Sequence, residues 1–478
     1  MLSRRSLALT LMLGMVAAAG GCGSPSVDNP NIQKDPPAAH PAVVNLIHAS
    51  PDAPSVDVYF DGKKTISAVD YRKSSGNVMV APGSHKVEIR PAGAADSDMP
   101  VWSNYVVLQS DQKVLLTAVG RVAETSGATK FNLVAQRLGI SDPAQVQLRL
   151  LHASPGAPSL DVAIGDNVLL SGASFGSATA YGAVKGDLAG TVTLSLRSTG
   201  DTEVLAGLKL PGPIKAGSVV TAIALGEIDP LSSDAKFLRV TLFDEATGML
   251  TDVPLTINDQ GTHSTLYVFH AAPDAPAVDI FAKNGARLIG GLAYQKASPL
   301  LDLMPGAYQI DVKPAGMSAV VTSASVKLLP GLNWVVYAVG FATKTGAQGL
   351  AIRSAPRAVK GASSLYRAVH AVPDAATFDL KNNGPTLFAR LTYPLASPYR
   401  SDDLPVGKLQ LLLGTKSWDV VVPQMVADNA AGEVTSLFVT GSSTIPGSPL
   451  GVVAVIESSA TTMQAPTVVS LMTTVTPP

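Results

Sequence analysis

Residues 44–60, VNLIHASPDAPSVDVYF, open a unit that recurs three more times along the chain. The related stretches begin at Leu148 (LRLLHASPGAPSLDVAI), Leu266 (LYVFHAAPDAPAVDIFA) and Leu365 (LYRAVHAVPDAATFDLK). Each contains a histidine, then Ala-x-Pro-x-Ala, and an aspartate nine positions after the histidine. The pairs are His48/Asp57, His152/Asp161, His270/Asp279 and His370/Asp379. An internal repeat is the strongest signal of organisation that a single sequence carries, so it fixes the architecture first.

Three further kinds of residue keep the same order in every unit. An aromatic residue follows the histidine by 23 or 24 positions, a Ser or Thr lies four beyond it, and a glycine closes a later apolar run. These residues are Tyr71, Phe175, Tyr294 and Tyr393; Ser75, Thr179, Ser298 and Ser397; and Gly120, Gly226, Gly340 and Gly441. The steps between histidines are 104, 118 and 100 residues, which is the length of a domain. We therefore expect each unit to have its own core and to fold alone.

Period-two alternation and β-branched runs dominate each unit. In the first copy they predict strands at 44–48, 56–60, 64–69, 77–80, 85–90, 101–108, 113–119 and 131–135. Short strands at this spacing, separated by turn residues, indicate a β-sandwich of immunoglobulin-like type. The predicted domains are residues 42–140, 144–258, 262–358 and 362–475, which makes the chain an all-β protein of four tandem sandwiches.

Composition excludes two classes of protein. Hydrophobic residues make up 46% of the chain, which argues against disorder. The formal net charge is −1 and charged residues are only 15%, so the basic footprint of a nucleic-acid binder is missing.

The first 21 residues have the pattern of a lipoprotein signal peptide. Arg4 and Arg5 precede an apolar run of 13 residues, Leu7 to Ala19, which is too short to span a membrane. Small residues then lead to Cys22, the only cysteine of the chain, which predicts lipidation there and a Pro-rich tether over residues 22–41. Ordinary signal-peptidase cleavage and twin-arginine export stay open as alternatives. A chain anchored in this way would be extracytoplasmic, at the outer membrane or cell surface.

The opening motif resembles a bacterial family of repeated extracytoplasmic domains known as domain of unknown function 4397. The resemblance covers nearly all of residues 42–475, and copies one and three match best. Gly156 replaces the first Asp of the motif in copy two, and Ala376 replaces the second Pro in copy four. The resemblance implies a secreted or surface-anchored β-domain, used in tandem, and implies no reaction.

The recurring His and Asp raise the question of catalysis. A serine hydrolase needs a nucleophile beside the imidazole, and Ser50 and Ser154 lie two residues after their histidines. Copies three and four have Ala272 and Val372 at that position, so the nucleophile is not kept while His and Asp are. We expect a structural role instead, with the Asp carboxylate accepting from the imidazole or from loop amides.

Ligand sites have weak support in the sequence. Zinc needs three or four converging ligands, and each unit supplies one motif histidine. A calcium site using Asp52, Asp57 and Asp61 stays open for the first copy. Aromatic residues are only 5%, which is sparse for carbohydrate platforms, and no phosphate-binding loop is present. No cofactor is expected.

These observations predict a non-enzymatic, lipid-anchored envelope protein whose sandwiches act as a scaffold, spacer or adhesion module. The alternative is an envelope binding protein that takes up a polysaccharide or a partner protein through loops of individual repeats.

Overall fold

The computed structural model describes residues 40–95, 97–124, 127–357, 364–382, 384–414, 416–427, 433–444, 448–457, 466–471 and 473–475. The predicted signal peptide, Cys22 and most of the tether lie outside these residues. Within them, regular structure is almost entirely strand; one 3-10 turn, η1 (Gly346–Gln348), and one helical turn, α1 (Gln424–Ala427), are the exceptions. No helix of the described part is long and apolar enough to cross a membrane. The predicted all-β class of tandem sandwiches is confirmed.

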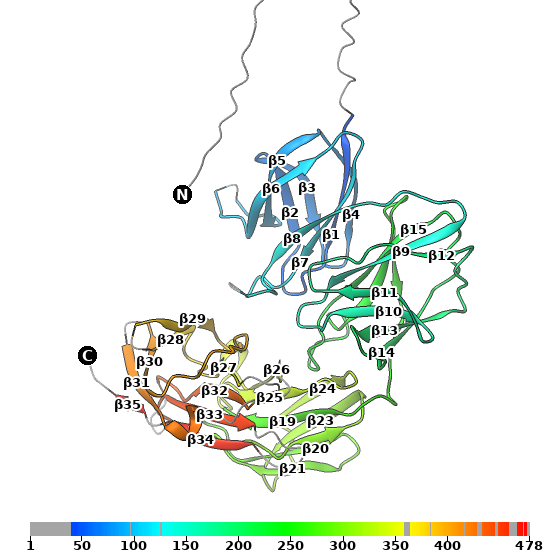
Figure 1. Cartoon of the computed structure of the whole chain (residues 1–478). Helices are drawn as coiled ribbons and strands as arrows, with labels where there is room; N and C mark the ends of the chain where they lie inside the picture. Colours follow the sequence, from blue (N-terminus) through cyan, green and yellow to red (C-terminus); the bar gives the residue numbers. More distant parts are fainter. Residues whose placement is uncertain are drawn as a thin grey trace, which may run out of the picture. The chain divides into compact units, whose positions relative to one another are not determined.

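Two four-stranded sheets form the first sandwich, drawn in blue in Figure 1. One sheet has the order β4-β1-β7-β8, with β4 (Ser74–Val80), β1 (Ala42–His48), β7 (Lys113–Val119) and β8 (Asn132–Arg137). The other has the order β3-β2-β5-β6, with β3 (Lys63–Val69), β2 (Val56–Phe60), β5 (Gly83–Pro91) and β6 (Trp102–Leu108). All eight predicted strands are present, and their ends shift by three residues at most.

The second repeat keeps this plan and adds one strand to each sheet. Its first sheet is β12 (Gly182–Lys185), β9 (Gln145–Ala153), β15 (Val219–Leu225), β16 (Arg239–Asp244) and β17 (Leu250–Val253), in that order. Its second sheet is β11 (Asn167–Ala173), β10 (Leu160–Ile164), β13 (Thr193–Ser198), β14 (Val204–Lys209) and β18 (Leu255–Ile257).

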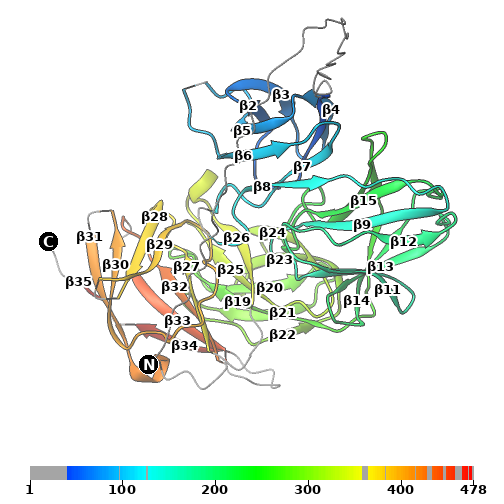
Figure 2. The same cartoon turned by 45° about the horizontal axis from the view of Figure 1, so that its top comes forward.

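The third repeat has the strand order of the first, whereas in the fourth β27 is itself an edge strand and the sheet continues to β34 at its other end (Figure 2). The third has β22 (Leu301–Leu303), β19 (Ser264–His270), β25 (Trp334–Val339) and β26 (Ala351–Pro356) in one sheet, and β21 (Arg287–Leu292), β20 (Val278–Ala282), β23 (Gly306–Pro314) and β24 (Thr322–Leu328) in the other. The fourth has β27 (Leu365–His370), β32 (Val434–Thr440), β33 (Gly451–Glu457) and β34 (Thr467–Leu471) in one, and β29 (Thr386–Thr392), β28 (Thr377–Lys381), β30 (Gly407–Leu413), β31 (Lys416–Val422) and β35 (Thr473–Val475) in the other.

The strand that carries the motif histidine pairs in parallel with a late strand of its own repeat. In the first repeat, β1 and β7 pair from Val43↔Lys113 to His48↔Ala118, and the other three repeats show the same parallel pair. All residues of β1 but Val43 are buried, and so are all residues of β7 after Lys113. Strands buried on both faces have continuous apolar sequences, which explains why VNLIHA does not alternate cleanly.

The two faces of this sheet belong to two different cores. Leu46, Leu116 and Ala118 point into the first sandwich. The alternate residues Ile47 and Leu115 join a cluster with residues of the second repeat, because successive side chains of a strand point to opposite faces. The second-repeat residues of this cluster are Leu151, Ala153, Ile223, Leu225 and Phe243.

Repeats three and four share a cluster of the same kind. The rings of Phe269, from the third repeat, and Phe438, from the fourth, stack with centroids 4.1 Å apart, and Tyr337 meets Phe438 edge-on. Val335, Val369, Val453 and Val455 complete this cluster with other residues of both repeats. One outer face of each repeat is thus buried against a neighbour, and the apolar core cluster of repeats two and three is continuous. That each unit folds alone stays a prediction.

Candidate functional site

The motif histidines end the first strand of each repeat and are fully buried. In repeats one to three, Nε2 lies 2.9–3.0 Å from the carbonyl oxygen of the proline six residues on: Pro54, Pro158 and Pro276. In all four repeats, Nδ1 accepts the amide N–H two residues on, at 3.2–3.3 Å: Ser50, Ser154, Ala272 and Val372. Because a carbonyl only accepts and an amide N–H only donates, the first three imidazoles must be neutral with the proton on Nε2.

The recurring aromatic residue packs edge-on against the histidine. The ring centroids of His48 and Tyr71 lie 6.0 Å apart at 76°, and the pairs in the other repeats have nearly the same geometry. Burial lowers the pKa of His48, His152 and His270. His370, whose Nε2 has no hydrogen-bond partner among the described residues, has its pKa lowered to about 3, again mainly by burial.

The recurring aspartate bonds to backbone amides, and the described contacts include no hydrogen bond between it and the histidine. Asp57 Oδ1 accepts the amide of Ala68 at 2.7 Å, and Asp279 Oδ1 accepts that of Gly291 at 2.7 Å. Asp161 and Asp379 accept the equivalent amides of Gly172 and Arg390. The donors to the aspartate are therefore backbone amides and not the imidazole, and the four named here lie on the neighbouring strands β3, β21, β11 and β29.

The serines considered as nucleophiles are committed to the backbone. Ser50 Oγ donates to the carbonyl of Gly120 at 2.6 Å, and Ser154 Oγ donates to that of Gly226 at 2.6 Å. Both serines are fully buried. A buried hydroxyl that donates its hydrogen bond to a backbone carbonyl is not placed to attack a substrate.

The first aspartate of the motif holds the loop that follows the closing glycine. Asp52 accepts the amides of Val122 and Ala123, both at 2.9 Å, and Asp274 accepts those of Ala342 and Thr343. Asp374 accepts the amide of Ser443 in the fourth repeat. Asp57 and Asp61 bond elsewhere, Asp61 to Lys86 and His85. The three carboxylates proposed for calcium thus have separate partners, and the described residues contain no group of three potential metal ligands.

The recurring Ser or Thr side chain makes a hydrogen bond to the backbone of the strand that carries the histidine. Its hydroxyl oxygen accepts the amide of the residue two before the histidine at 2.9–3.0 Å in every repeat. These donors are Leu46, Leu150, Val268 and Ala368. In the first repeat the pairing of β1 with β4 is irregular at this point. The hydroxyl oxygen replaces the carbonyl that a regular neighbouring strand would supply, because a buried amide needs an acceptor.

The closing glycine is required by its backbone. Gly226 has φ +95°, and a Cβ there would lie 2.6 Å from the carbonyl oxygen of Phe237. The glycine at this position in the other three repeats also has positive φ and faces backbone atoms. Any other residue would therefore be strained and would clash.

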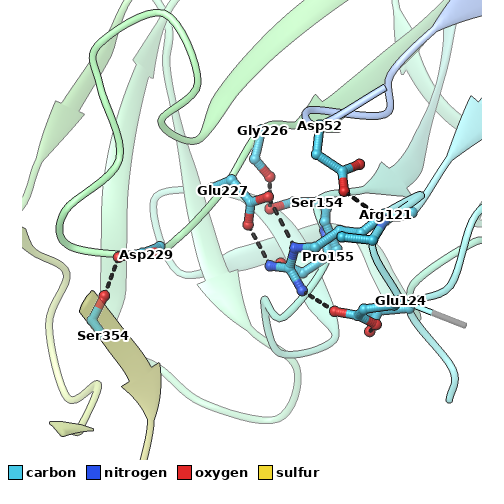
Figure 3. A network of polar contacts seen from close by, with 12 residues as sticks. Asp52, Arg121, Glu124, Ser154, Pro155, Gly226, Glu227, Asp229 and Ser354 are labelled. Atoms are coloured by element: carbon cyan, nitrogen blue, oxygen red, sulfur yellow. Dashed lines mark hydrogen bonds and ion pairs between the residues drawn. The ribbon is translucent and has the colours of Figure 1, made fainter. Parts of the chain in front are cut away.

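Charged residues join the first two repeats at this corner (Figure 3). Arg121, which follows Gly120, pairs with Glu227, which follows Gly226; Arg121 Nε lies 3.0 Å from Glu227 Oε1. The same guanidinium donates to Glu124 at 2.6 Å and to the carbonyl of Pro155 at 3.1 Å. Burial opposes the charge of Arg121, but the hydrogen bonds and charge of Glu227 outweigh it and raise the pKa of Arg121.

A second polar cluster links the same repeats, and the sequence analysis missed it. Arg149 is 4% exposed and donates to Thr221 at 2.8 Å and to the carbonyl of Arg137, in the first repeat, at 3.0 Å. Its Nη2 lies 3.4 Å from Glu245, which also accepts from the Tyr181 hydroxyl.

The fourth repeat has the equivalent arginine. Arg367 donates to Ser436 at 3.1 Å and to the carbonyl of Pro356, in the third repeat, at 2.6 Å. The sequence signal for these clusters is an arginine three residues before the histidine, present in copies two and four only. Copies one and three have Asn45 and Tyr267 there. The arginine marks the even repeat of each pair.

The described cores contain little free space. A cavity of about 30 Å³ lies inside the third sandwich, lined by Val268, His270, Ile280 and Val336 among others. That volume is of the order of one or two water molecules.

The fold, and the loop that follows each motif histidine, define a tandem β-sandwich protein. Its recurring polar residues make hydrogen bonds that hold strands and turns of the same repeat in place. The chain belongs to the family described as domain of unknown function (DUF4397), whose model matches residues 42–163, 146–248 and 264–366. The fourth repeat lies almost wholly beyond these matches, yet it has the same parallel pair of strands and two sheets of related order.

Other comparisons add little. The search of the curated proteins gave no match. Among solved structures, the chain is similar to the Bacillus anthracis TIE protein at 7% sequence identity, with a TM-score of 0.14, over 62% of this chain and 50% of that one. The chain thus spans about half the length of that protein, and a likeness at this level carries no functional conclusion.

Proposed function

We propose that the chain is a non-enzymatic, lipid-anchored protein of the cell envelope whose paired sandwiches act as a stiff scaffold. One observation carries the scaffold role: the polar residues that recur in the motif bond to the backbone of their own repeat. The histidines, aspartates and serines described above hold strands and turns, which leaves no repeated set of side chains facing a common substrate.

The contacts between repeats support stiffness. Side chains of neighbouring repeats share three apolar clusters, and buried arginines cross from repeat two to one and from repeat four to three. Repeats two and three are also joined, because Lys327 donates its amide to the carbonyl of Pro230 at 2.8 Å and its ammonium to Asp234 at 2.7 Å. Large apolar contacts between domains suppress the relative motion that is otherwise expected of them.

The anchor is proposed from the sequence alone. Cys22 follows a charged and apolar leader and is the only cysteine. A lipid there would hold the sandwiches at an extracytoplasmic membrane surface, at the outer membrane or on the cell exterior.

The anchor is tested by Cys22→Ala in the producing cell. We expect the variant to move from the detergent-soluble membrane fraction to the aqueous extracytoplasmic fraction, with its fold unchanged. Ser24→Ala, two residues on, is the matched control and should stay with the membrane. A Cys22→Ala chain that partitions like the wild type would contradict the anchor.

A binding role is the second candidate, and exposed methionines favour it. Met99 is 89% exposed in the loop between β5 and β6, and Met317 is 62% exposed in the equivalent loop of the third repeat. Flexible apolar side chains in the same loop of two repeats suit adaptable contacts. Binding of the full chain to purified envelope polysaccharide, compared with the Met99→Ser/Met317→Ser variant, tests this role; equal binding, or none by either chain, would argue against it.

A further inference from the structure

One edge strand of each sandwich has an equivalent in the other three repeats. A further strand covers two of these four edges, and a third edge makes one backbone hydrogen bond to a neighbouring repeat. In the second repeat, β18 pairs antiparallel with β14; in the fourth, β35 pairs antiparallel with β31. In the third repeat, the amide of Lys327 on β24 donates to Pro230 of the second repeat. The equivalent strand of the first repeat, β6, has no strand on its outer edge among the described residues.

The sequence of β6 offers nothing that would block pairing. Its seven residues, WSNYVVL, include no charge and no proline, and its pairing with β5 has no bulge. Several other edge strands carry charges in the strand, among them Lys63 and Lys64 on β3, Arg137 on β8, and Arg353 on β26. The uncharged edge strands β4 and β11 have bulges in their pairing, and β34 is uncharged and without a bulge as β6 is. Charges, prolines and bulges are the usual protection of an exposed edge, so β6 is an unprotected one.

The backbone of β6 has a defined outer side. The carbonyl of Lys86 on β5 accepts the amide of Asp61, so the polar backbone groups of Lys86 face β2. Tyr105 pairs with Lys86, and its own N–H and C=O must therefore face away from β5. The amide of Tyr105 donates to Oδ1 of the adjacent Asn104 at 2.8 Å, so a side chain serves as the acceptor that a further strand would supply.

Apolar side chains flank this open edge. Tyr105 is 68% exposed and Val107 is 67% exposed, both on the face turned away from the core. A Tyr and a Val at alternate positions on one face are typical of a strand whose side chains pack against those of a neighbouring strand.

We propose that β6 pairs antiparallel with β6 of a second copy of this chain, centred on Tyr105. In that register Tyr105 lies opposite its equivalent, and Ser103 lies opposite Val107 in both directions. A two-fold pairing brings a strand's residues against those of the same strand, so a charged strand tends to repel itself while a neutral strand does not. Neutrality and aromatic pairing are the features of β6 that favour a second copy over a charged partner strand.

A single pair of strands buries a small area, so the dimer in solution is weak. Anchoring of both copies to one membrane would raise their effective concentration. The test is therefore made on the unanchored chain, so that a failure of the anchor and a failure of the dimer are distinguishable.

The experiment uses the full chain carrying Cys22→Ala, studied by sedimentation velocity over a range of concentrations. We expect a reversible dimer, and Tyr105→Lys should raise its dissociation constant by about tenfold or more, because the register then places two lysines directly opposite each other. Met79→Lys is the control: Met79 is also 68% exposed but lies on β4, in the other sheet, so the dimer should persist.

A cysteine probe reports the register. In the chain without Cys22, Tyr105→Cys should give a covalent dimer with a short bis-maleimide, and Met79→Cys should give little. A chain that stays monomeric at the highest concentration, or a dimer that Tyr105→Lys leaves intact, would overturn the proposal. Binding of β6 to an unrelated strand peptide by an otherwise monomeric chain would also overturn it.

Discussion

At the level of single residues, a neutral imidazole bridges two backbone groups of the same loop. His270 donates to the carbonyl of Pro276 and accepts the amide of Ala272, while Asp279 accepts the amides of Gly291 and Gly316. The two side chains have no common partner, although they recur together. Their fixed spacing reflects the short connection from β19 to β20: His270 holds the loop between these strands, and Asp279, on β20, holds β21 and the turn after β23.

Separate partners predict additive effects. His270→Ala removes two buried hydrogen bonds and leaves an unpaired carbonyl, which costs on the order of 1–3 kcal/mol and lowers the melting temperature by several degrees. Asp279→Ala should lower it as well, through loss of two amide contacts. The double variant should lose close to the sum of the two shifts, measured by thermal unfolding of the full chain. A double variant no worse than either single one would show that the two residues act as a unit.

The buried histidines also predict acid sensitivity. Burial lowers their pKa below the value near 6.5 of an unfolded chain. Between these values the unfolded chain binds protons that the folded chain does not, so the free energy of unfolding falls as the pH drops below about 6.5. The melting temperature should decrease between about pH 7.5 and pH 5, before most carboxylates titrate.

Two variants check the sign of this effect. His270→Gln should make the dependence on pH shallower. His85 is the matched opposite: its hydrogen bond with Asp61 raises its pKa, so it contributes stability at low pH that is lost as the pH rises. His85→Gln should therefore make the loss on acidification steeper. A melting temperature that is flat over this range would contradict the neutral, buried imidazole.

At the level of elements, the sequence predicted the strands well and the contacts between sheets poorly. Turn residues and β-branched runs located all eight strands of the first repeat, because these signals are local. The contact of β1 with the second repeat has no local signal in the sequence. Leu46 and Ile47 are similar residues, yet Leu46 faces its own sandwich and Ile47 faces the next repeat. A continuous apolar strand signals burial on both faces but does not say what covers the second face.

The arginine of the even repeats was the available clue to this pairing. Arg149 interrupts an apolar strand, and a buried guanidinium needs acceptors that its own strand cannot supply. The acceptors are Thr221, Glu245 and the Arg137 carbonyl of the first repeat.

Arg149→Met should therefore weaken the contact between repeats one and two. It leaves the carbonyl of Arg137 and one side of Glu245 without a donor, at a cost of about 1–3 kcal/mol. Adding Glu245→Gln removes the unpaired charge and should recover part of the loss. Thermal unfolding of the four chains of this cycle measures the coupling, and a coupling near zero would contradict the buried cluster.

At the level of the whole molecule, every repeat packs against its neighbours in the chain. The apolar clusters on the outer faces join repeat one with two and repeat three with four, and the arginines of the even repeats cross the same boundaries. A third apolar cluster is continuous across repeats two and three. The sequence established four copies and their fold, but identical motifs could not reveal pairing, because pairing depends on residues outside the motif. It also left open whether the Asp accepts from the imidazole or from backbone amides, and the contacts found are with backbone amides.

Paired repeats are the central claim of this account, and the melting of separate fragments tests it most directly. Residues 262–358 alone would expose Tyr267, Phe269 and Tyr337, all of them buried in the full chain. We predict that residues 262–478, which contain repeats three and four, unfold in a single transition at a clearly higher temperature than either repeat alone. If residues 262–358 instead melt cooperatively at the same temperature as the two-repeat fragment, the repeats are independent and the claim is wrong.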